Sequence, residues 1–389
     1  MKSLGIISEF NPFHNGHKFL LDKAKSKLEV DLSISIMSGD FVQRGEPAII
    51  DKFTRSRVAV KEGFDLVIEM PSFVSLQAAP FFALKSVDIL DKLNVDYLVF
   101  GIENISPADF LKYSDIIIEK TEEIDELTKK YLDQGLSYTK SHNHAIENFV
   151  DEDFLSSNNI LALEYIRAIK KLNSNIIAYP IKRIKTLNKD KNIKDNTFAS
   201  STAIRKNINS EIEGLLPKSS HDELRKYLKK YNHFDDELIY SIFRYKILIE
   251  KCPMDEILGY EQGISNYLYK LATSNKTYND FLDDASSQRY TRSRIKRLIL
   301  NYILNNEIKL NNIDISFIKV LSYNKNTIKY FKDISSKTTL ILNKKDIVNL
   351  DSTNKLIYEK MIQASNLYSL GIDQEFDFDF KHNNRPIDG

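Results

Sequence analysis

A single cysteine, Cys252, is all that this sequence contains. One cysteine excludes an intramolecular disulfide and a zinc site built from several cysteines, and this usage is typical of the reducing cytoplasm. Long hydrophobic runs are also missing, because the apolar residues after Lys2 stop at Glu9, too soon for a signal peptide or a membrane span. We therefore expect a cytoplasmic protein without a membrane role, and no protein partner is evident.

An excess of charge of either sign is absent as well. Lys and Arg number 55 against 54 for Asp and Glu, which gives a formal net charge of +1. This balance excludes a chain whose whole surface attracts polyanions, so any surface for nucleic acid has to be local.

The 389 residues exceed what one hydrophobic core usually organises, so two domains are expected. In the first half, short apolar runs alternate with helical patterns, which predicts an α/β fold with a Rossmann-like parallel sheet. Pro71 and Pro180 are expected to end their strands. The predicted strands are residues 3–8, 31–37, 65–70, 96–101 and 175–179.

From about Leu215 onward the pattern changes to amphipathic helices. Ile295, Leu298 and Ile299, for example, repeat at helical spacing. The sequence thus predicts a catalytic domain over residues 1–215 and a mainly α-helical domain over residues 216–389. A solvated loop is expected at residues 185–196 and an irregular tail at residues 374–389.

His14, Gly16 and His17 carry the strongest chemical signal, because they stand between the first predicted strand and the first predicted helix. That junction exposes backbone N–H groups and the positive end of a helix, which suits phosphate. Gly16 allows close approach, and two imidazoles three positions apart both face the ligand. Hydrogen bonds from them would stabilise a triphosphate as charge builds up on it.

Two nearby histidines can also be surface polar groups or metal ligands. A zinc site needs a third and a fourth ligand, and the neighbouring sequence offers none of cysteine or histidine type. Doubly wound sheets bind nucleotides after their first strand, and this position favours the phosphate role. No protein-bound metal is expected.

A second polar segment, at residues 199–205, follows the last predicted strand and the polar loop. Ser201 and Thr202 at a helix start offer donors to phosphate, and Arg205 lies one turn further on. Alone, this pattern equally fits a capped helix with an exposed arginine. Combined with the two histidines, it favours a phosphate site.

Together, the two motifs resemble the HIGH-type nucleotidyltransferase superfamily, which includes class I aminoacyl-tRNA synthetases and adenylyltransferases. A longer set of motifs, in the same order, resembles the bacterial tRNA(Met) cytidine acetate ligase family. These motifs are EFNPFHNGH at 9–17, SGDFVQRGEPA at 38–48, DLVIEMP at 65–71, FGIE at 100–103, NNIL at 158–161, Arg183, SSTAIRK at 200–206 and RYTRSR at 289–294.

The resemblance implies an ATP-dependent ligase that forms a carbon–nitrogen bond. It would activate acetate with ATP and Mg²⁺ as acetyl-adenylate and then acetylate N4 of the wobble cytidine in the anticodon of elongator tRNA(Met). His14 and His17 would be the catalytic residues. The expected ATP contacts, from the resemblance and from the residue 199–205 segment, are Ile7, Ser8, Glu9, Phe10, Asn11, Pro12, Phe13, Asn15, Gly16, Lys18, Phe19, Leu20, Gly101, Asn158, Arg183, Ser201, Thr202 and Arg205.

Basic residues gather in two stretches, one after Gly39 and one in the RYTRSR segment. Such residues contact RNA phosphates, and an exposed aromatic side chain stacks on an unpaired base; a solvated helix face has the same composition. The candidates for tRNA binding are Arg44, Lys52, Arg55, Arg289, Tyr290, Arg294 and Arg297.

Two other functions stay open at this point. A small-molecule adenylyltransferase would share the nucleotide motifs, although such enzymes are usually compact and do not need a helical second half. A non-catalytic RNA-binding protein would share the basic clusters, although binding alone does not require two histidines that stabilise charge.

Overall fold

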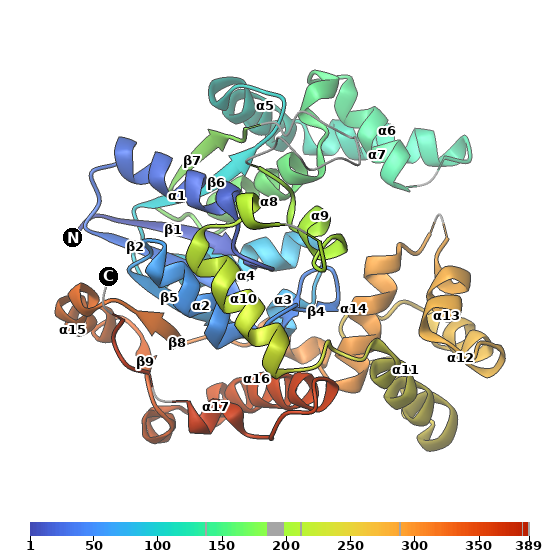
Figure 1. The fold of residues 1–389 in the computed structure, drawn as a ribbon. Coiled ribbons are helices and arrows are strands. Elements are labelled where there is room, and N and C mark those ends of the chain that lie inside the picture. The colour runs from blue at the N-terminus through green and yellow to red at the C-terminus, as the bar shows by residue number, and fades with distance from the viewer. Residues whose placement is uncertain (137, 185–197, 211, 288, 383, 388–389) are drawn as a thin grey trace.

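A seven-stranded sheet forms the centre of the molecule (Figure 1). The computed structural model describes residues 1–136, 138–184, 198–210, 212–287, 289–382 and 384–387. The sheet order is β7-β6-β1-β2-β5-β8-β9, and β3 and β4 form a separate antiparallel hairpin. The strands are β1 (Ser3–Ser8), β2 (Leu32–Ser38), β3 (Phe41–Val42), β4 (Glu46–Pro47), β5 (Leu66–Met70), β6 (Tyr97–Ile102), β7 (Ile177–Lys182), β8 (Phe317–Tyr323) and β9 (Thr339–Ile341).

The five strands expected from the sequence are all present and run parallel to one another. Pro71 directly follows β5 as predicted, but Pro180 lies inside β7, so the prediction that it ends the strand is wrong. β7 is an edge strand, where a residue without an N–H donor is tolerated.

Helices cover both faces of this sheet (Figure 1). Leu21 and Ala24 of α1 and Val58 of α2 pack in one hydrophobic cluster with Leu4 and Val67 of the sheet. The helices are α1 (Asn15–Lys27), α2 (Lys52–Lys61), α3 (Ser72–Ser75), α4 (Ala79–Lys92), α5 (Pro107–Glu119), α6 (Thr121–Asp133), α7 (Tyr138–Glu147), α8 (Ser157–Lys171), α9 (Ser201–Lys206), α10 (Lys218–Lys230), α11 (Asp236–Arg244), α12 (Ile264–Ser274), α13 (Tyr278–Ala285), α14 (Arg292–Ile303), α15 (Phe331–Ser335), α16 (Ser352–Gly371) and α17 (Phe378–Lys381).

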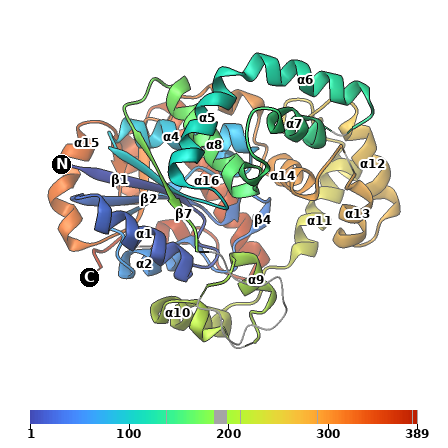
Figure 2. The same cartoon turned by 90° about the horizontal axis from the view of Figure 1, so that it is seen from above.

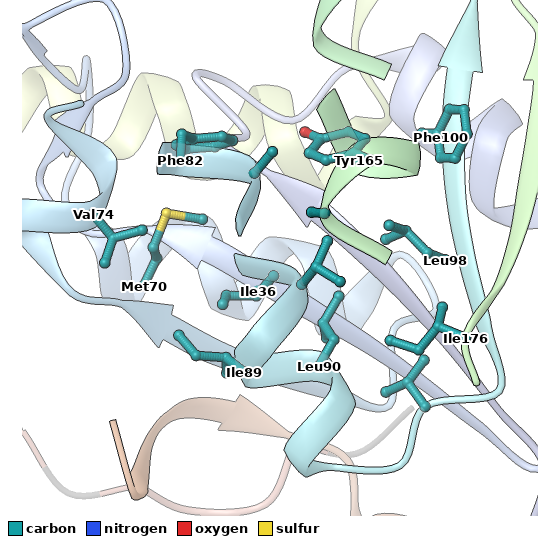
Figure 3. Close-up of a cluster of buried hydrophobic side chains, with 14 of the residues drawn as sticks. Ile36, Met70, Val74, Phe82, Ile89, Leu90, Leu98, Phe100, Tyr165 and Ile176 are labelled. Carbon is teal, nitrogen blue, oxygen red and sulfur yellow. The ribbon is translucent and has the colours of Figure 1, made fainter. Parts of the chain in front are cut away.

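On the opposite face, α4 and α8 bury the alternate residues of the same strands. Ile36 of β2, Leu98 of β6 and Leu90 of α4 belong to this second cluster (Figure 3). β1, β5 and β6 are therefore mostly buried on both sides and read as nearly continuous hydrophobic runs, whereas Ser33 and Ser35 alternate with the apolar residues of β2.

The order of the strands fixes where a ligand fits. From β1 the chain moves to β2 and β5 on one side, and then returns to β6 and β7 on the other side of β1. β1 and β6 are thus the neighbours at which the direction of winding reverses, and doubly wound sheets bind ligands beyond the carboxyl ends of such strands. In this chain those ends are Ser8 and Ile102.

The second half of the chain is mainly helical, as predicted, and α11–α14 gather at one end of the molecule beyond β4 (Figure 2). Ile295, Leu298 and Ile299 of α14 belong to a hydrophobic cluster that also includes Phe41 and Leu76 from the first half. However, β8 and β9 belong to this half and extend the central sheet, with β8 antiparallel to β5. The sheet continues past residue 216, and the division of the chain there stays a prediction.

Two further expectations concern irregular segments. The tail is not wholly irregular, because α17 forms within it and Asp379 is buried against Lys52 and Lys319. The loop expected at 185–196 lies outside the described residues. Among the helices that the structure does describe, none combines the length and the apolar character needed to cross a membrane.

Candidate nucleotide site

The turn after β1 orients both histidines through local hydrogen bonds. His14 is the N-cap of α1, and its Nδ1 accepts a hydrogen bond from the backbone N–H of Gly16 at 3.1 Å. His17 closes the capping box, because its Nδ1 accepts from the backbone N–H of His14 at 3.2 Å. A neutral imidazole that accepts at Nδ1 carries its hydrogen on Nε2. Both rings therefore have an Nε2–H donor to offer to a ligand.

Packing holds these two rings in place. They stack with centroids 3.7 Å apart and an interplanar angle of 17°, and Phe10 meets the His17 ring edge-on at 5.0 Å. Burial, with a smaller effect from Arg183, lowers the pKa of His14 to about 3. Burial also lowers the pKa of His17 well below its usual value, aided by His14 and Arg183. Both rings are thus neutral donors at physiological pH.

Gly16 has a steric role in the same turn. A Cβ atom at this position would lie 2.9 Å from a carbon and 3.0 Å from Nδ1 of the His14 ring. Contacts below 3 Å require a shift of one partner, so any larger residue would displace the His14 ring. The glycine of the motif is therefore needed for the placement of the first histidine.

The histidines line a cavity of about 730 Å³ beyond the carboxyl ends of β1 and β6. This volume falls within the range of about 300–1,000 Å³ that is typical of ligand sites. The predicted residues that line it are Ile7, Ser8, Glu9, Phe10, His14, Gly16, His17, Phe19, Leu20, Gly101, Asn158, Arg183, Ser201, Thr202 and Arg205.

Five predicted ATP contacts do not line the cavity: Asn11, Pro12, Phe13, Asn15 and Lys18. They support the turn instead. Asn11 accepts a hydrogen bond from the backbone N–H of Ile49 at 2.8 Å, and the Phe13 carbonyl accepts one from the Ser220 hydroxyl at 2.6 Å.

The last two of these five residues, Asn15 and Lys18, have polar partners that do not line the cavity. The Asn15 amide donates to the Gly214 carbonyl, and Lys18 pairs with Asp22 one turn along α1.

Glu103 lines the cavity and was not predicted from the sequence as a site residue. Its carboxylate accepts a hydrogen bond from Asn158 at 2.6 Å and lies 3.4 Å from the guanidinium of Arg183. Asn159 fixes its backbone by bonding both its N–H and its carbonyl. Glu103 thereby ties together two predicted residues, Asn158 of α8 and Arg183 directly after β7. The only signal for it was its place at the end of the FGIE motif.

On the opposite wall, α9 begins at the predicted Ser/Thr segment. Ser200 caps the helix by accepting a hydrogen bond from the Ala203 N–H at 3.2 Å, and Ser201 and Thr202 line the cavity. Arg205 donates to the Asn11 carbonyl at 2.9 Å. The motif around the histidines and the segment at 199–205 therefore meet at one cavity, as predicted.

Comparisons with known proteins agree with this geometry. The model of the HIGH Nucleotidyl Transferase family matches residues 1–383. The tRNA(Met) cytidine acetate ligase of Thermoanaerobacter sp. is 33% identical over 389 residues, covering 95% of each chain. That of Listeria monocytogenes is 33% identical over 379 residues, again with 95% of each chain covered. The chain belongs to the tRNA(Met) cytidine acetate ligase family.

A solved structure supports the same assignment. Thermotoga maritima TmcAL, bound with alpha-thio ATP, superimposes with a TM-score of 0.87 at 28% sequence identity over 100% of both chains. The fold predicted from the sequence, a Rossmann-like sheet of the HIGH type followed by a mainly helical part, is confirmed.

For a member of a tRNA-modifying family, the placement of the basic residues matters, and Lys52 and Arg55 do not lie where the sequence predicts. Both are buried, with exposed fractions of 1% and 0%. The Lys52 ammonium lies 2.8 Å from Glu69 and 2.9 Å from Asp379. The Arg55 guanidinium donates to four backbone carbonyls, those of Glu9, Ser38, Gly39 and Ile50. Neither residue can contact tRNA, because buried partners occupy their donors.

Side chains of the RYTRSR segment also contact other residues of the same chain. Tyr290 is only 7% exposed, so it cannot stack on a base as predicted. The guanidinium groups of Arg289 and Arg294 lie over its ring, 5.3 and 5.1 Å from the centroid, and both pair with Glu261. Arg289 and Arg294 stay predictions as tRNA contacts, but part of their charge is already neutralised.

Arg297 joins this helix to the hairpin beside the cavity. Its guanidinium donates to the Gln43 carbonyl at 3.1 Å, and the neighbouring Lys296 pairs with Glu46 at 2.7 Å. Gly45, with φ +73°, allows this contact, because a Cβ there would lie 2.6 Å from the Arg297 backbone nitrogen. Arg44, which follows Gln43 in the hairpin, is exposed and lines the cavity. It is the predicted tRNA contact best placed at the site.

Proposed function

We propose that this protein is an ATP-dependent ligase that activates acetate as acetyl-adenylate and acetylates N4 of the wobble cytidine of elongator tRNA(Met). The observation that carries the proposal is the pair of neutral Nε2–H donors that line a nucleotide-sized cavity at the switch point of the sheet. The protein belongs to the tRNA(Met) cytidine acetate ligase family, and this supports tRNA(Met) as the substrate. A tRNA substrate also implies that the protein acts in the cytoplasm.

The first half-reaction joins acetate to the adenylate. An acetate oxygen attacks the α-phosphorus of MgATP, and the bond to the pyrophosphate oxygen breaks. Negative charge increases on the phosphate oxygens as this happens, and the two imidazole N–H groups are hydrogen-bond donors for that charge. Arg183, the only further cation in the wall formed by β6, β7 and α8 among the described residues, adds a fixed positive charge on the same side.

Mg²⁺ enters this scheme as part of the nucleotide substrate. In the parts of the chain that the structure describes, no three His, Cys, Asp or Glu side chains gather into a metal site. Magnesium is commonly held by substrate phosphates with few protein ligands. Acetyl transfer to the cytidine amine then releases AMP. We further propose that residues 216–389 contribute to binding of the tRNA, since Arg297 of α14 bonds to the hairpin whose Gln43 and Arg44 line the cavity.

Labelled acetate provides the test. The protein is incubated with MgATP, labelled acetate and elongator tRNA(Met), and the tRNA is digested to nucleosides. Label in N4-acetylcytidine is the expected result, and a matched tRNA with uridine at the wobble position should take up none. Transfer of AMP to a metabolite without acetate would contradict the proposal, as would retention of tRNA without any consumption of ATP.

A further inference from the structure

Glu9 occupies a special position along the edge of the sheet. Going from β7 toward β2, the cavity wall presents first Arg183, then Gly101 and Glu103, then the two histidines after β1. Beyond β1 it continues with Gln43 and Arg44 from the hairpin that follows β2. Glu9 directly follows β1 and lines the cavity between the histidines and this hairpin. By the order of the strands, it therefore lies on the opposite side of the histidines from Arg183 and Glu103.

One oxygen of the Glu9 carboxylate has a structural partner. Its Oε1 accepts a hydrogen bond from the Gln43 backbone N–H at 2.9 Å, which fixes the hairpin against β1. Within the described residues, no donor forms a hydrogen bond to Oε2. The carboxylate thus combines one anchored oxygen with one that is available to a ligand in the cavity.

The cations around Glu9 are three arginines, two of which donate to backbone carbonyls. Arg205 of α9, Arg44 of the hairpin and Arg55 of α2 are its nearest cations, and Tyr165 of α8 faces it as well. Arg55 and Arg205 donate to backbone carbonyls, and none of the three forms an ion pair with Glu9 among the described contacts. Burial raises the pKa of Glu9 above its usual value despite the opposing effects of the Gln43 N–H and the arginines.

The other titratable side chains of the wall are poor proton acceptors. His14 and His17 use Nδ1 to accept backbone hydrogen bonds and carry their hydrogens on Nε2, and burial lowers the pKa of both. Glu103 is held by Asn158 and Arg183 on the far side of the histidines. Among the described lining residues, Glu9 is left as the free base on the side of the hairpin.

We propose that the end of the cavity bounded by Glu9, Gln43 and Arg44 takes the cytosine ring, and that Glu9 accepts the proton which the N4 amine loses. This inference rests on the proposed function. N4 attacks the carbonyl carbon of acetyl-adenylate, a carbon–nitrogen bond forms, and the carbon–oxygen bond to AMP breaks with its electron pair on the phosphate. One N4 proton passes to the Glu9 carboxylate. Such a base matters because the N4 lone pair is delocalised into the ring and is a weak nucleophile until it loses a proton.

Synthetic acetyl-adenylate isolates the transfer step. It is mixed with elongator tRNA(Met) and excess protein, and N4-acetylcytidine is followed over a single turnover from pH 5 to pH 8.5. Glu9→Gln keeps an oxygen for the Gln43 N–H but removes the base, so transfer should slow by about 100-fold or more. Glu122→Gln makes the same chemical change on the exposed face of α6 and should transfer at the wild-type rate.

The pH profile separates catalysis from structure. In the wild type, transfer should fall as the pH drops through the raised pKa of Glu9, because the protonated acid cannot accept a proton. The rate of Glu9→Gln should not show this fall at low pH, which is the acid limb of the profile. Glu9→Asp should restore part of the rate together with the acid limb. A purely structural role of Glu9 would lower the rate without removing the limb.

The outcomes distinguish the two proposals. If the wild type transfers no acetyl group from acetyl-adenylate, the proposed function itself fails. If the wild type transfers and Glu9→Gln matches it in rate and pH profile, only the role of Glu9 is overturned. Should Glu9→Gln not fold, as judged from its melting temperature, the wild-type profile decides: a rate that does not fall at any acid pH at which the wild type stays folded excludes Glu9 as the base.

Discussion

The cavity after β1 and the two basic stretches, residues 44–57 and 289–297, differ in where their polar groups are directed. In the turn, backbone N–H groups two and three positions away occupy Nδ1 of each histidine and leave Nε2–H as the donor of two rings that line the cavity. In the basic stretches, Lys52, Arg55 and Arg297 use their donors on distant parts of the same chain.

This difference shows what a charge in a sequence can indicate. A motif whose contacts are local predicts the direction of its side chains, because the chain itself supplies the partners. A cluster of lysines and arginines predicts only that charge is present, since a carboxylate or a carbonyl from elsewhere in the fold decides whether that charge reaches a ligand. Four predictions sharpen the comparison, beginning with the largest effect.

Lys52→Met tests the assignment of this lysine to the protein interior. The substitution leaves Asp40, Glu69 and Asp379 buried with less positive charge, so the free energy of unfolding should fall by about 3–5 kcal/mol. Urea denaturation measures this loss. Lys120→Met, which removes an exposed ion pair between the N-cap of α6 and Glu123, should change stability by no more than about 0.5 kcal/mol. A Lys52→Met protein of normal stability with weakened tRNA binding would reverse our assignment.

His17→Ala tests the site. Loss of one well-placed donor to a charged transition state typically costs about 10²- to 10³-fold in rate, so acetate-dependent exchange between ATP and pyrophosphate should fall by that factor. The exposed His233 provides the matched control, and His233→Ala should exchange at the wild-type rate. Full exchange activity in His17→Ala would mean that the histidine is structural.

Gly16→Ala probes placement rather than chemistry. The added methyl group would lie 2.9 Å from the His14 ring and push it aside. A displacement of about 1 Å in a catalytic group can cost up to about 100-fold, so we expect a loss of exchange between about 10-fold and 100-fold. At Gly214, by contrast, nothing lies within 4 Å of an added Cβ, and Gly214→Ala should be silent. Equal rates for the two variants would count against the steric role of Gly16.

Arg44→Ala should have the smallest effect. This exposed side chain at the cavity rim is expected to contact an RNA phosphate, so its loss should reduce the slope of log affinity against log salt by about 1 for tRNA. Arg294→Ala should change the slope less, because Glu261 already shares its charge. A larger change for Arg294 than for Arg44, measured by titration at several salt concentrations, would shift the RNA surface to α14.

Much of the fold could be predicted from the sequence, because β1, β2, β5, β6 and β7 are short, largely apolar runs separated by helical patterns. β8 was not recognised. Lys319 lies in the middle of that strand and is buried only because Glu69 and Asp379 pair with it, and no local pattern reveals those partners. The α17 turn depends on the same buried ion pairs and was missed for the same reason.

The residues of the site also fall into two groups, those placed by local sequence and those placed by contacts with distant elements. The histidines, Gly16 and the start of α9 could be proposed from the sequence because each stands at a strand–helix junction or a capped helix start, and they line one cavity, while their roles stay predictions. Glu103 was not predicted, because its role comes from contacts with Asn158, Asn159 and Arg183, which belong to other elements. Tyr290 was expected to be exposed, and only the packing of two arginines and Glu261 around it shows otherwise.

A crystal structure of the protein with a non-hydrolysable ATP analogue would show where the two imidazoles lie relative to the triphosphate. The account predicts that Nε2 of His14 and Nε2 of His17 each lie within about 2.7–3.2 Å of an oxygen of the triphosphate. A triphosphate bound away from the turn after β1, or a ring of either histidine rotated so that Nε2 faces the protein, would contradict it.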